Sequence, residues 1–237
     1  RVEFLEPDGS GPVANAISRR GAHLFAAGLS TGNFDGLAAH LESAGIPATR
    51  ESGQLFLNGA NTGGFGLQVV ISLEESLPAI GALDFFYETT LLVDDARSRV
   101  QQCADIFDLD TGPFVPIDSD NYGYDGTLTL FRENRLDRFE IITPNNPENT
   151  MGRYFKKFGE GYYMAFAESD QLVDIEQKAR EAGLGHTPVR PNDRPEGQTA
   201  DTVFLHPPTL GGMMLGISRP TMAWSWSGQP DKVEAPA

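Results

Sequence analysis

The chain has 237 residues, of which 40% are hydrophobic and 10% aromatic, and its formal net charge is -15 at pH 7. This composition is sufficient for ordinary hydrophobic cores, and the length allows one large domain or two smaller ones. We expect no nucleic-acid or anionic-membrane partner, because binding to phosphates requires neutralising cations. No apolar run approaches the roughly 20 residues that span a bilayer. Cys103 is the only cysteine, which fits a reducing, cytoplasmic location.

The first part of the chain contains signals for strands and one helix. Residues 1–7 alternate apolar and acidic side chains up to a proline, which predicts a strand. A second strand, which includes His23, is expected over Gly21–Leu29. Residues Asn33–Ala44 place apolar side chains on one stripe, which predicts a helix. Two more strands are expected at Leu55–Leu57 and Gly64–Ile71, and a turn-rich run over residues 58–63 separates them.

The second part of the chain is predicted to be richer in strands. Residues 72–84 have the composition of a linker, and Asp94 or Asp95 is suited to begin a helix that ends near Leu109. Cys103 lies on the apolar side of that helix, so we expect a buried thiol rather than a nucleophile. Strands are expected at Phe85–Val93, Phe114–Ile117, Gly126–Phe131, Arg138–Ile142, Tyr162–Ala167, Thr202–Leu205 and Met213–Ile217, and a second helix at Gln171–Ala182.

Three further segments have distinct compositions. A short basic helix is expected between the strands at Arg138–Ile142 and Tyr162–Ala167, and Thr187–Thr199 is expected to be a polar, mobile loop. Residues 219–237 lack periodicity. Their two tryptophans, Trp224 and Trp226, are expected to pack on the body, with residues 232–237 frayed.

An internal repeat indicates that one structural unit was duplicated. The triplet RVE at Arg1–Glu3 returns as RFE at Arg138–Glu140. Similarly, AGI at Ala44–Ile46 returns as AGL at Ala182–Leu184. The repeat favours two similar halves over one large domain.

Several of these segments resemble the vicinal oxygen chelate superfamily, above all its methylmalonyl-CoA epimerase-like and glyoxalase-like members. GEGYYMAFAESDQL (Gly159–Leu172) resembles the start of a second module, and FLHPPTLGGMMLGI (Phe204–Ile217) resembles its closing strand. LFLNGANTGGFGLQVVI (Leu55–Ile71) is a second copy of that ending. The strand and helix at Tyr87–Leu109 resemble the opening of a module.

The resemblance implies an α+β fold in which βαβββ modules pair into open, cupped β-barrels. Three modules are expected, at Gly21–Ser72, Phe85–Pro144 and Gly161–Ser218. Residues 1–7 would be the last strand of a fourth module. The chain would divide into an incomplete first half (1–72), a linker (73–84), a second barrel (85–218) and a tail (219–237). The incomplete half is expected to be completed by another chain, as in a homodimer, or to remain structurally incomplete.

The resemblance also implies a metal site in the first half. Glu3, His23 and Gln68 stand at the three available ligand positions of the family, and the fourth ligand would precede Arg1. Oxygen and nitrogen donors of this kind suit a divalent Mn, Fe, Co, Ni or Zn ion. Each residue taken alone is equally consistent with a purely structural role.

The corresponding positions in the second half are Glu88, Glu140, Tyr163 and Gly216, which offer no nitrogen ligand. We therefore expect no tight metal site there. These residues are expected to converge on a concave face, where Glu88, Glu140 and Tyr163 would be catalytic. A stabilising barrel without a site is the alternative. Three aromatic or thioether side chains are expected to bind substrate: Tyr162, Phe204 and Met214.

Three functions remain open. The first is a metal-dependent lyase or isomerase that moves a proton next to a metal-bound carbonyl or enediolate of a small oxygenated substrate. The second is an extradiol-type dioxygenase, which ranks lower because the second half lacks histidines at its ligand positions. The third is a metal-free small-molecule binding protein that encloses its ligand with aromatic side chains.

Overall fold

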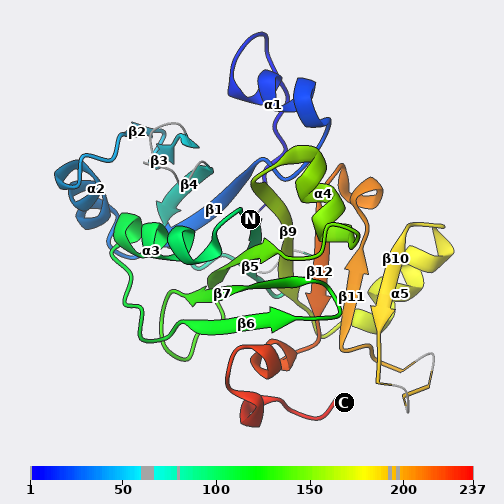
Figure 1. Ribbon diagram of the computed structural model, residues 1–237. Coiled ribbons are helices and arrows are strands. Elements are labelled where there is room, and N and C mark those ends of the chain that lie inside the picture. Colours follow the sequence, from blue (N-terminus) through cyan, green and yellow to red (C-terminus); the bar gives the residue numbers. More distant parts are fainter. Residues whose placement is uncertain (1, 60–66, 79–80, 192–193, 196–197, 237) are drawn as a thin grey trace.

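The computed structural model describes residues 2–236 except 60–66, 79–80, 192–193 and 196–197, and it contains three βαβββ modules (Figure 1). The first module forms a four-stranded sheet with the order β1-β4-β3-β2. Its first and last strands, β1 and β4, pair in parallel. The elements of this module are β1 (Ala26–Thr31), α2 (Phe34–Ser43), β2 (Ala48–Glu51), β3 (Gln54–Leu57) and β4 (Gln68–Leu73).

The second and third modules share one eight-stranded sheet with the order β10-β11-β12-β9-β5-β8-β7-β6. The second module consists of β5 (Phe85–Leu92), α3 (Ala96–Phe107), β6 (Val115–Ser119), β7 (Tyr124–Leu130) and β8 (Arg138–Pro144). The third consists of β9 (Gly161–Glu168), α5 (Leu172–Glu181), β10 (His186–Val189), β11 (Thr202–Leu205) and β12 (Met214–Ser218). The antiparallel pair β5–β9 joins the two modules.

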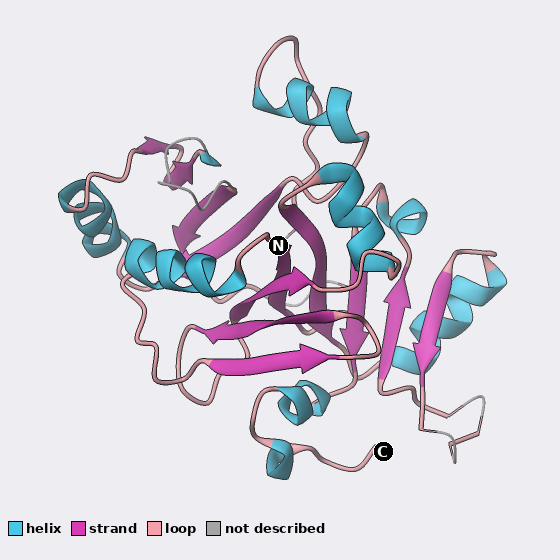
Figure 2. Cartoon of the chain, viewed as in Figure 1, coloured by secondary structure: helices cyan, strands magenta, loops and turns pink. Residues whose placement is uncertain are grey.

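The same strand relation recurs in each module, which confirms the internal repeat and the α+β fold expected from the resemblance. In both modules of the large sheet, the first strand pairs in parallel with the last, as β5 does with β8 and β9 with β12. Figure 2 shows α1, α2 and α5 toward the outside of the molecule, at the top, left and right of the view. Additional helices lie between or after modules: α1 (Pro12–Arg20), α4 (Thr150–Phe158), η2 (Pro207–Leu210), η3 (Met222–Trp226) and η4 (Pro230–Lys232).

One face of the large sheet forms the main core together with the first module. Leu91, Phe139 and Ile141 point to this face and pack in one cluster with Val69 and with Cys103 of α3. Side chains alternate between the two faces of a strand, so Thr90, Arg138 and Glu140 point to the opposite face. Burial of the first face therefore fixes which polar side chains meet on the second.

Several local expectations are wrong. Residues 2–7 form no strand, because their alternating side chains stay largely exposed and find no partner strand in the described part of the chain. His23 lies before β1 rather than on it. The short strand β2 was not anticipated, and part of the expected loop Thr187–Thr199 is strand β10. The turn-rich run over residues 58–63 lies mostly outside the described residues.

The capping of helices follows the sequence signals closely. Asp95 accepts a hydrogen bond from the backbone nitrogen of Ser98 and so caps α3, and Asn33 does the same for α2 through Gly36. Cys103 is fully buried, as expected, and burial raises the pKa of its thiol to about 12. None of the helices in the described residues has the length and apolar character needed to cross a bilayer.

Gly126 of β7 tests how tightly the large sheet is packed. A methyl group at this position would lie 2.1 Å from the backbone oxygen of Ile141 on β8, and backbone atoms cannot move aside cheaply. We expect Gly126→Ala to lower the free energy of unfolding by about 1–3 kcal/mol. Gly28→Ala on β1 is the matched control, because a methyl group there meets nothing within 4 Å. Equal stability of the two variants in urea denaturation would contradict this packing.

Candidate functional site

The face of the large sheet opposite the main core carries a cluster of polar side chains, which we call the carboxyl cluster: Glu88, Thr90, Arg138 and Glu140. The parallel register of β5 and β8 places Glu88 opposite Arg138 and Thr90 opposite Glu140. Directly paired residues share a face of the sheet, so all four side chains meet. Two strands that are separated in sequence therefore bring two acids and one cation together.

A buried ion pair lies at the centre of the carboxyl cluster. Arg138 Nε donates to Glu88 Oε2 at 2.6 Å, and the two side chains are 0% and 1% exposed. Arg138 Nη1 donates to the hydroxyl of Ser227 at 2.8 Å, and the guanidinium lies 5.1 Å from the centre of the Tyr87 ring. Arg138 Nη2 is buried and has no hydrogen-bond partner among the described residues. This donor is therefore free to bind an oxygen atom of a ligand.

The second carboxyl, Glu140, is 7% exposed and accepts a 2.5 Å hydrogen bond from Thr90 Oγ1. Burial and the neighbouring Glu88 raise the pKa of Glu140 from 4.5 to about 8. Burial also raises the pKa of Glu88 above its usual value, and the contact with Arg138 and a hydrogen bond with Glu140 offset only part of this rise. One cation neutralises only one carboxylate, and its ion pair with Glu88 favours the charge on Glu88 and the proton on Glu140.

Tyr124 of β7 completes this side of the cluster. It points to the same face as Leu128, which is paired with Glu140. Burial, followed by the nearby charges of Glu140 and Glu88, raises the pKa of the Tyr124 phenol. A neutral phenol of this kind can donate a hydrogen bond to a ligand at any physiological pH.

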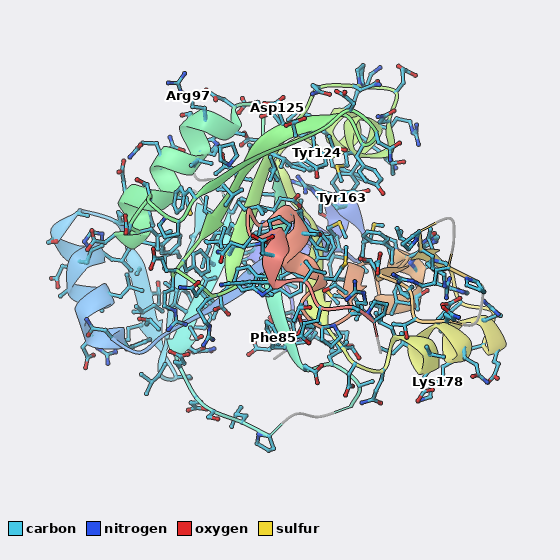
Figure 3. The ribbon with its side chains drawn as sticks, turned by 90° about the horizontal axis from the view of Figure 1, so that it is seen from below. Phe85, Arg97, Tyr124, Asp125, Tyr163 and Lys178 are labelled. Atoms are coloured by element: carbon cyan, nitrogen blue, oxygen red, sulfur yellow. The ribbon has the colours of Figure 1, made fainter. Side chains whose placement is uncertain are left out.

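The C-terminal segment covers the carboxyl cluster. Figure 3 shows this segment in red at the centre of the view from below, with Tyr124 labelled nearby. Ala223 is fully buried beside Tyr87, and the ring of Trp226 lies 6.4 Å from that of Phe166. The two tryptophans pack on the body as expected. Fraying from residue 232 is wrong, because Lys232 contacts the Trp224 ring at 4.3 Å.

A hollow of about 330 Å³ lies between this segment and the second module. Its wall includes Ser227, the residue that binds Arg138. The hollow therefore reaches the edge of the carboxyl cluster, and displacement of Ser227 would open it to the Arg138 guanidinium. The other wall residues include Phe114, Val115, Leu130 and Gln229.

The structure separates the second-half residues predicted from the sequence. Glu88 and Glu140 come together, but Tyr163 lies beside Tyr154 of α4, with ring centres 5.1 Å apart. The position of Gly216 faces the ring of Phe166, which fills the space that a larger side chain would need. Of the four residues, Glu88 and Glu140 alone are brought into the carboxyl cluster, and the concave site and the catalytic roles stay predictions.

The three expected substrate-binding residues also lie apart. Tyr162 is buried in the main core, where its hydroxyl donates to the backbone oxygen of Gln68 at 2.9 Å. Phe204 packs edge-on against Phe166 with ring centres 5.9 Å apart. Met214 lines a separate, larger pocket together with Tyr163 and His23. The sequence did not single out Arg138, Thr90 or Tyr124 as site residues, although the RFE repeat places Arg138 two positions from Glu140.

The predicted metal ligands of the first half do not form a strand-borne set. Glu3 lies in the exposed segment before α1, and His23 Nδ1 donates to the backbone oxygen of Gly21 at 2.7 Å. Gln68 Nε2 donates to Asn58 Oδ1. In the part of the chain that the structure describes, no three His, Cys, Asp or Glu side chains are grouped to hold a metal ion. The ligand set stays a prediction, and we derive no chemical step from it.

Comparison with solved structures finds similarity to several chains, each at low sequence identity. Methylmalonyl-CoA epimerase from Mycobacterium tuberculosis is 15% identical, with a TM-score of 0.49 over 61% of this chain and 93% of that one. The Streptomyces coelicolor enzyme in complex with 2-nitronate-propionyl-CoA is 14% identical, with a TM-score of 0.47 over 58% and 98%. A hypothetical protein from Bacillus halodurans is 16% identical, with a TM-score of 0.45 over 57% and 93%. No protein-family model and no curated protein sequence matches the chain.

Arg138 is expected to hold the cluster together. Arg138→Met leaves two buried carboxyls without a cation, so we expect the free energy of unfolding to fall by about 3–5 kcal/mol. Arg135→Met is the control, because Arg135 is 56% exposed and pairs with Asp137 at the surface. That change is expected to cost less than about 1 kcal/mol. The measurement is denaturant unfolding of both variants. Similar decreases in the free energy of unfolding would show that the buried ion pair does not contribute more to stability than the surface pair.

The raised pKa of Glu140 predicts a pH-dependent stability. Between pH 4.5 and about 8 the folded protein holds a proton that the unfolded chain has released, so stability falls as the pH rises through this range. Glu140→Gln removes this contribution and is therefore expected to become more stable relative to the wild type as the pH increases. The measurement is the urea midpoint against pH, with the exposed Glu148→Gln as control. A constant difference between Glu140→Gln and wild type would refute the assignment.

Proposed function

We propose that the second half of the chain is an acid–base enzyme of the lyase or isomerase type that moves a proton next to a carbonyl group of a small oxygenated substrate. The observation that carries the proposal is the pairing of two buried carboxyls with a single cation. Such a pair holds one carboxylate and one carboxylic acid at the same pH, which are the two forms that proton transfer requires.

Each member of the carboxyl cluster has a distinct role in this proposal. The free Nη2 of Arg138 donates a hydrogen bond to the substrate carbonyl oxygen and stabilises the negative charge that develops on it. Glu88 accepts the proton from the adjacent carbon. Glu140 delivers its proton to the resulting enolate, and the Glu88–Glu140 hydrogen bond then returns a proton to Glu140. Both carboxyls end the cycle as they began.

Access to the cluster requires a movement of the C-terminal segment. Glu88 and Glu140 are only 4% and 7% exposed, so no substrate reaches them while Ser227 binds Arg138. The adjoining hollow offers a path once Ser227, which lies between η3 and η4, moves away from Arg138. The same cover would exclude water from the reacting carbon, which strengthens every electrostatic interaction around it.

Hydrogen–deuterium exchange tests this function whatever the final product is. The protein is incubated in D₂O with 2-methyl-branched acyl thioesters and with α-hydroxy ketones, and loss of the C–H signal is followed by NMR. We expect exchange with at least one class, and a decrease of at least roughly 100-fold in Glu88→Gln.

Two variants complete the exchange experiment. Glu140→Gln is expected to abolish proton return and so to lower turnover to product, whereas Glu42→Gln, an exposed change on α2 of the first module, leaves exchange unchanged. Absence of exchange with every substrate of both classes, or equal exchange in wild type and Glu88→Gln, would refute proton transfer by the carboxyl cluster.

A further inference from the structure

A second pocket lies outside the carboxyl cluster and shares no residue with it. Its volume is about 650 Å³, which is within the range of roughly 300–1,000 Å³ found for small-molecule sites. The segment that leads into the first module forms one wall, and α4 with the third module forms the other. We call it the outer pocket, and the lining residues that matter here are Arg20, His23, Tyr154, Phe158, Tyr163 and Met214.

The outer pocket contains a fixed cation. Arg20 Nη2 donates to the backbone oxygens of Phe158 at 2.7 Å and Glu160 at 2.8 Å, so two carbonyls hold the guanidinium in place. A methyl group on Gly161 would lie 2.4 Å from Arg20 Nη1, so the glycine leaves room for this side chain. No carboxylate among the described residues forms an ion pair with Arg20. The charge is positioned without an acidic partner.

Aromatic rings form the wall next to this cation. The ring of Tyr154 lies 5.1 Å from that of Tyr163 at 75° and 4.9 Å from that of Phe158 at 54°. The Arg20 guanidinium lies 5.8 Å from the centre of the Phe158 ring. Edge-to-face arrangements of this kind offer ring surfaces on which a planar aromatic ligand can pack.

A hydrogen-bond acceptor faces the same space. His23 Nδ1 donates to the backbone oxygen of Gly21, so in the tautomer with this proton on Nδ1 the lone pair lies on Nε2. His23 lines the same pocket as the aromatic rings. A ligand hydroxyl group can therefore donate to Nε2.

The surroundings favour an anion as well. Although the chain has a net charge of -15, the last turn of α4 carries Lys156 and Lys157, and Lys157 lies 4.7 Å from the centre of the Phe158 ring. Cationic side chains of this kind raise the local concentration of anions.

We propose that the outer pocket binds a small aromatic carboxylate. Its carboxylate pairs with Arg20, its ring packs on Tyr154, Phe158 and Tyr163, and a hydroxyl group on the far side of the ring donates to His23. The site is independent of the proton-transfer function, because the two sites have no residue in common.

The experiment uses benzoate and 4-hydroxybenzoate as probes and measures their binding to the whole chain by calorimetry or ligand-observed NMR. Both probes are expected to bind saturably, with 4-hydroxybenzoate the tighter of the two. Arg20→Gln is expected to weaken benzoate binding by at least roughly tenfold, which corresponds to loss of one charged hydrogen-bonded contact. Neutral benzamide is expected to bind wild type and Arg20→Gln equally.

Matched variants separate the roles of the pocket residues. Arg19→Gln removes the adjacent, exposed arginine of α1 and is expected to leave benzoate binding unchanged. His23→Ala is expected to abolish the advantage of 4-hydroxybenzoate over benzoate, and Tyr163→Ala to weaken both probes. Circular dichroism establishes that each variant is folded. Absence of saturable binding to wild type, or equal weakening by Arg19→Gln and Arg20→Gln, would overturn the proposal.

Discussion

One buried cation serves two buried acids, and the second half of the molecule depends on this imbalance. Arg138 neutralises Glu88 at 2.6 Å, so the second carboxyl, Glu140, is stable in the sheet only with its proton. Burial of another unpaired charge would cost several kcal/mol. The same guanidinium binds Ser227, so a single side chain connects β5, β8 and the C-terminal segment. The proposed chemistry and the covering of the site thus have the same physical origin.

Repetition of one module explains where this cluster lies. In each module the first strand pairs in parallel with the last, so residues of these two strands always stand side by side. In the third module the corresponding strands, β9 and β12, bring together Phe166 and Gly216, and the space is filled by an aromatic ring. The two modules of the large sheet therefore differ in chemistry, although their topology is the same. One carries charge and the other carries aromatic surface.

The sequence predicted elements well where a periodic core face or a cap was present. Asp95 caps α3 as expected, α2 begins where its apolar stripe predicted, and the repeat correctly indicated like modules. Prediction from the sequence failed in two cases: where an alternating segment has no neighbouring strand, and where a strand has no alternation of apolar side chains. Residues 2–7 alternate but form no strand, and all four residues of β2 are exposed, so no apolar alternation revealed that strand.

The candidate site could be predicted only in part, because its residues depend on register. Glu88 and Glu140 were found from the resemblance, but the ion pair of Glu88 with Arg138 follows from the alignment of β5 with β8, which no single segment encodes. The resemblance also predicted that Tyr163 lies beside these two carboxyls. The pairing of β5 with β9, however, has a register shift between Thr90 and Leu91, which pair with Met164 and Tyr162, so Tyr163 has no directly opposite partner on β5. The cover formed by residues 222–226 depends on contacts with residues far away in sequence, which composition alone does not reveal.

The protonation state of Glu140 is the most direct measure of this account. Infrared difference spectroscopy at neutral pH compares the wild type with Glu140→Gln and Glu88→Gln, because a protonated carboxyl has a carbonyl stretch that an ionised one lacks. We predict that the wild type shows one such band from a buried carboxyl and that Glu140→Gln removes it. Absence of the band in the wild type at neutral pH, or its persistence in Glu140→Gln together with its loss in Glu88→Gln, would contradict the assignment of the proton to Glu140.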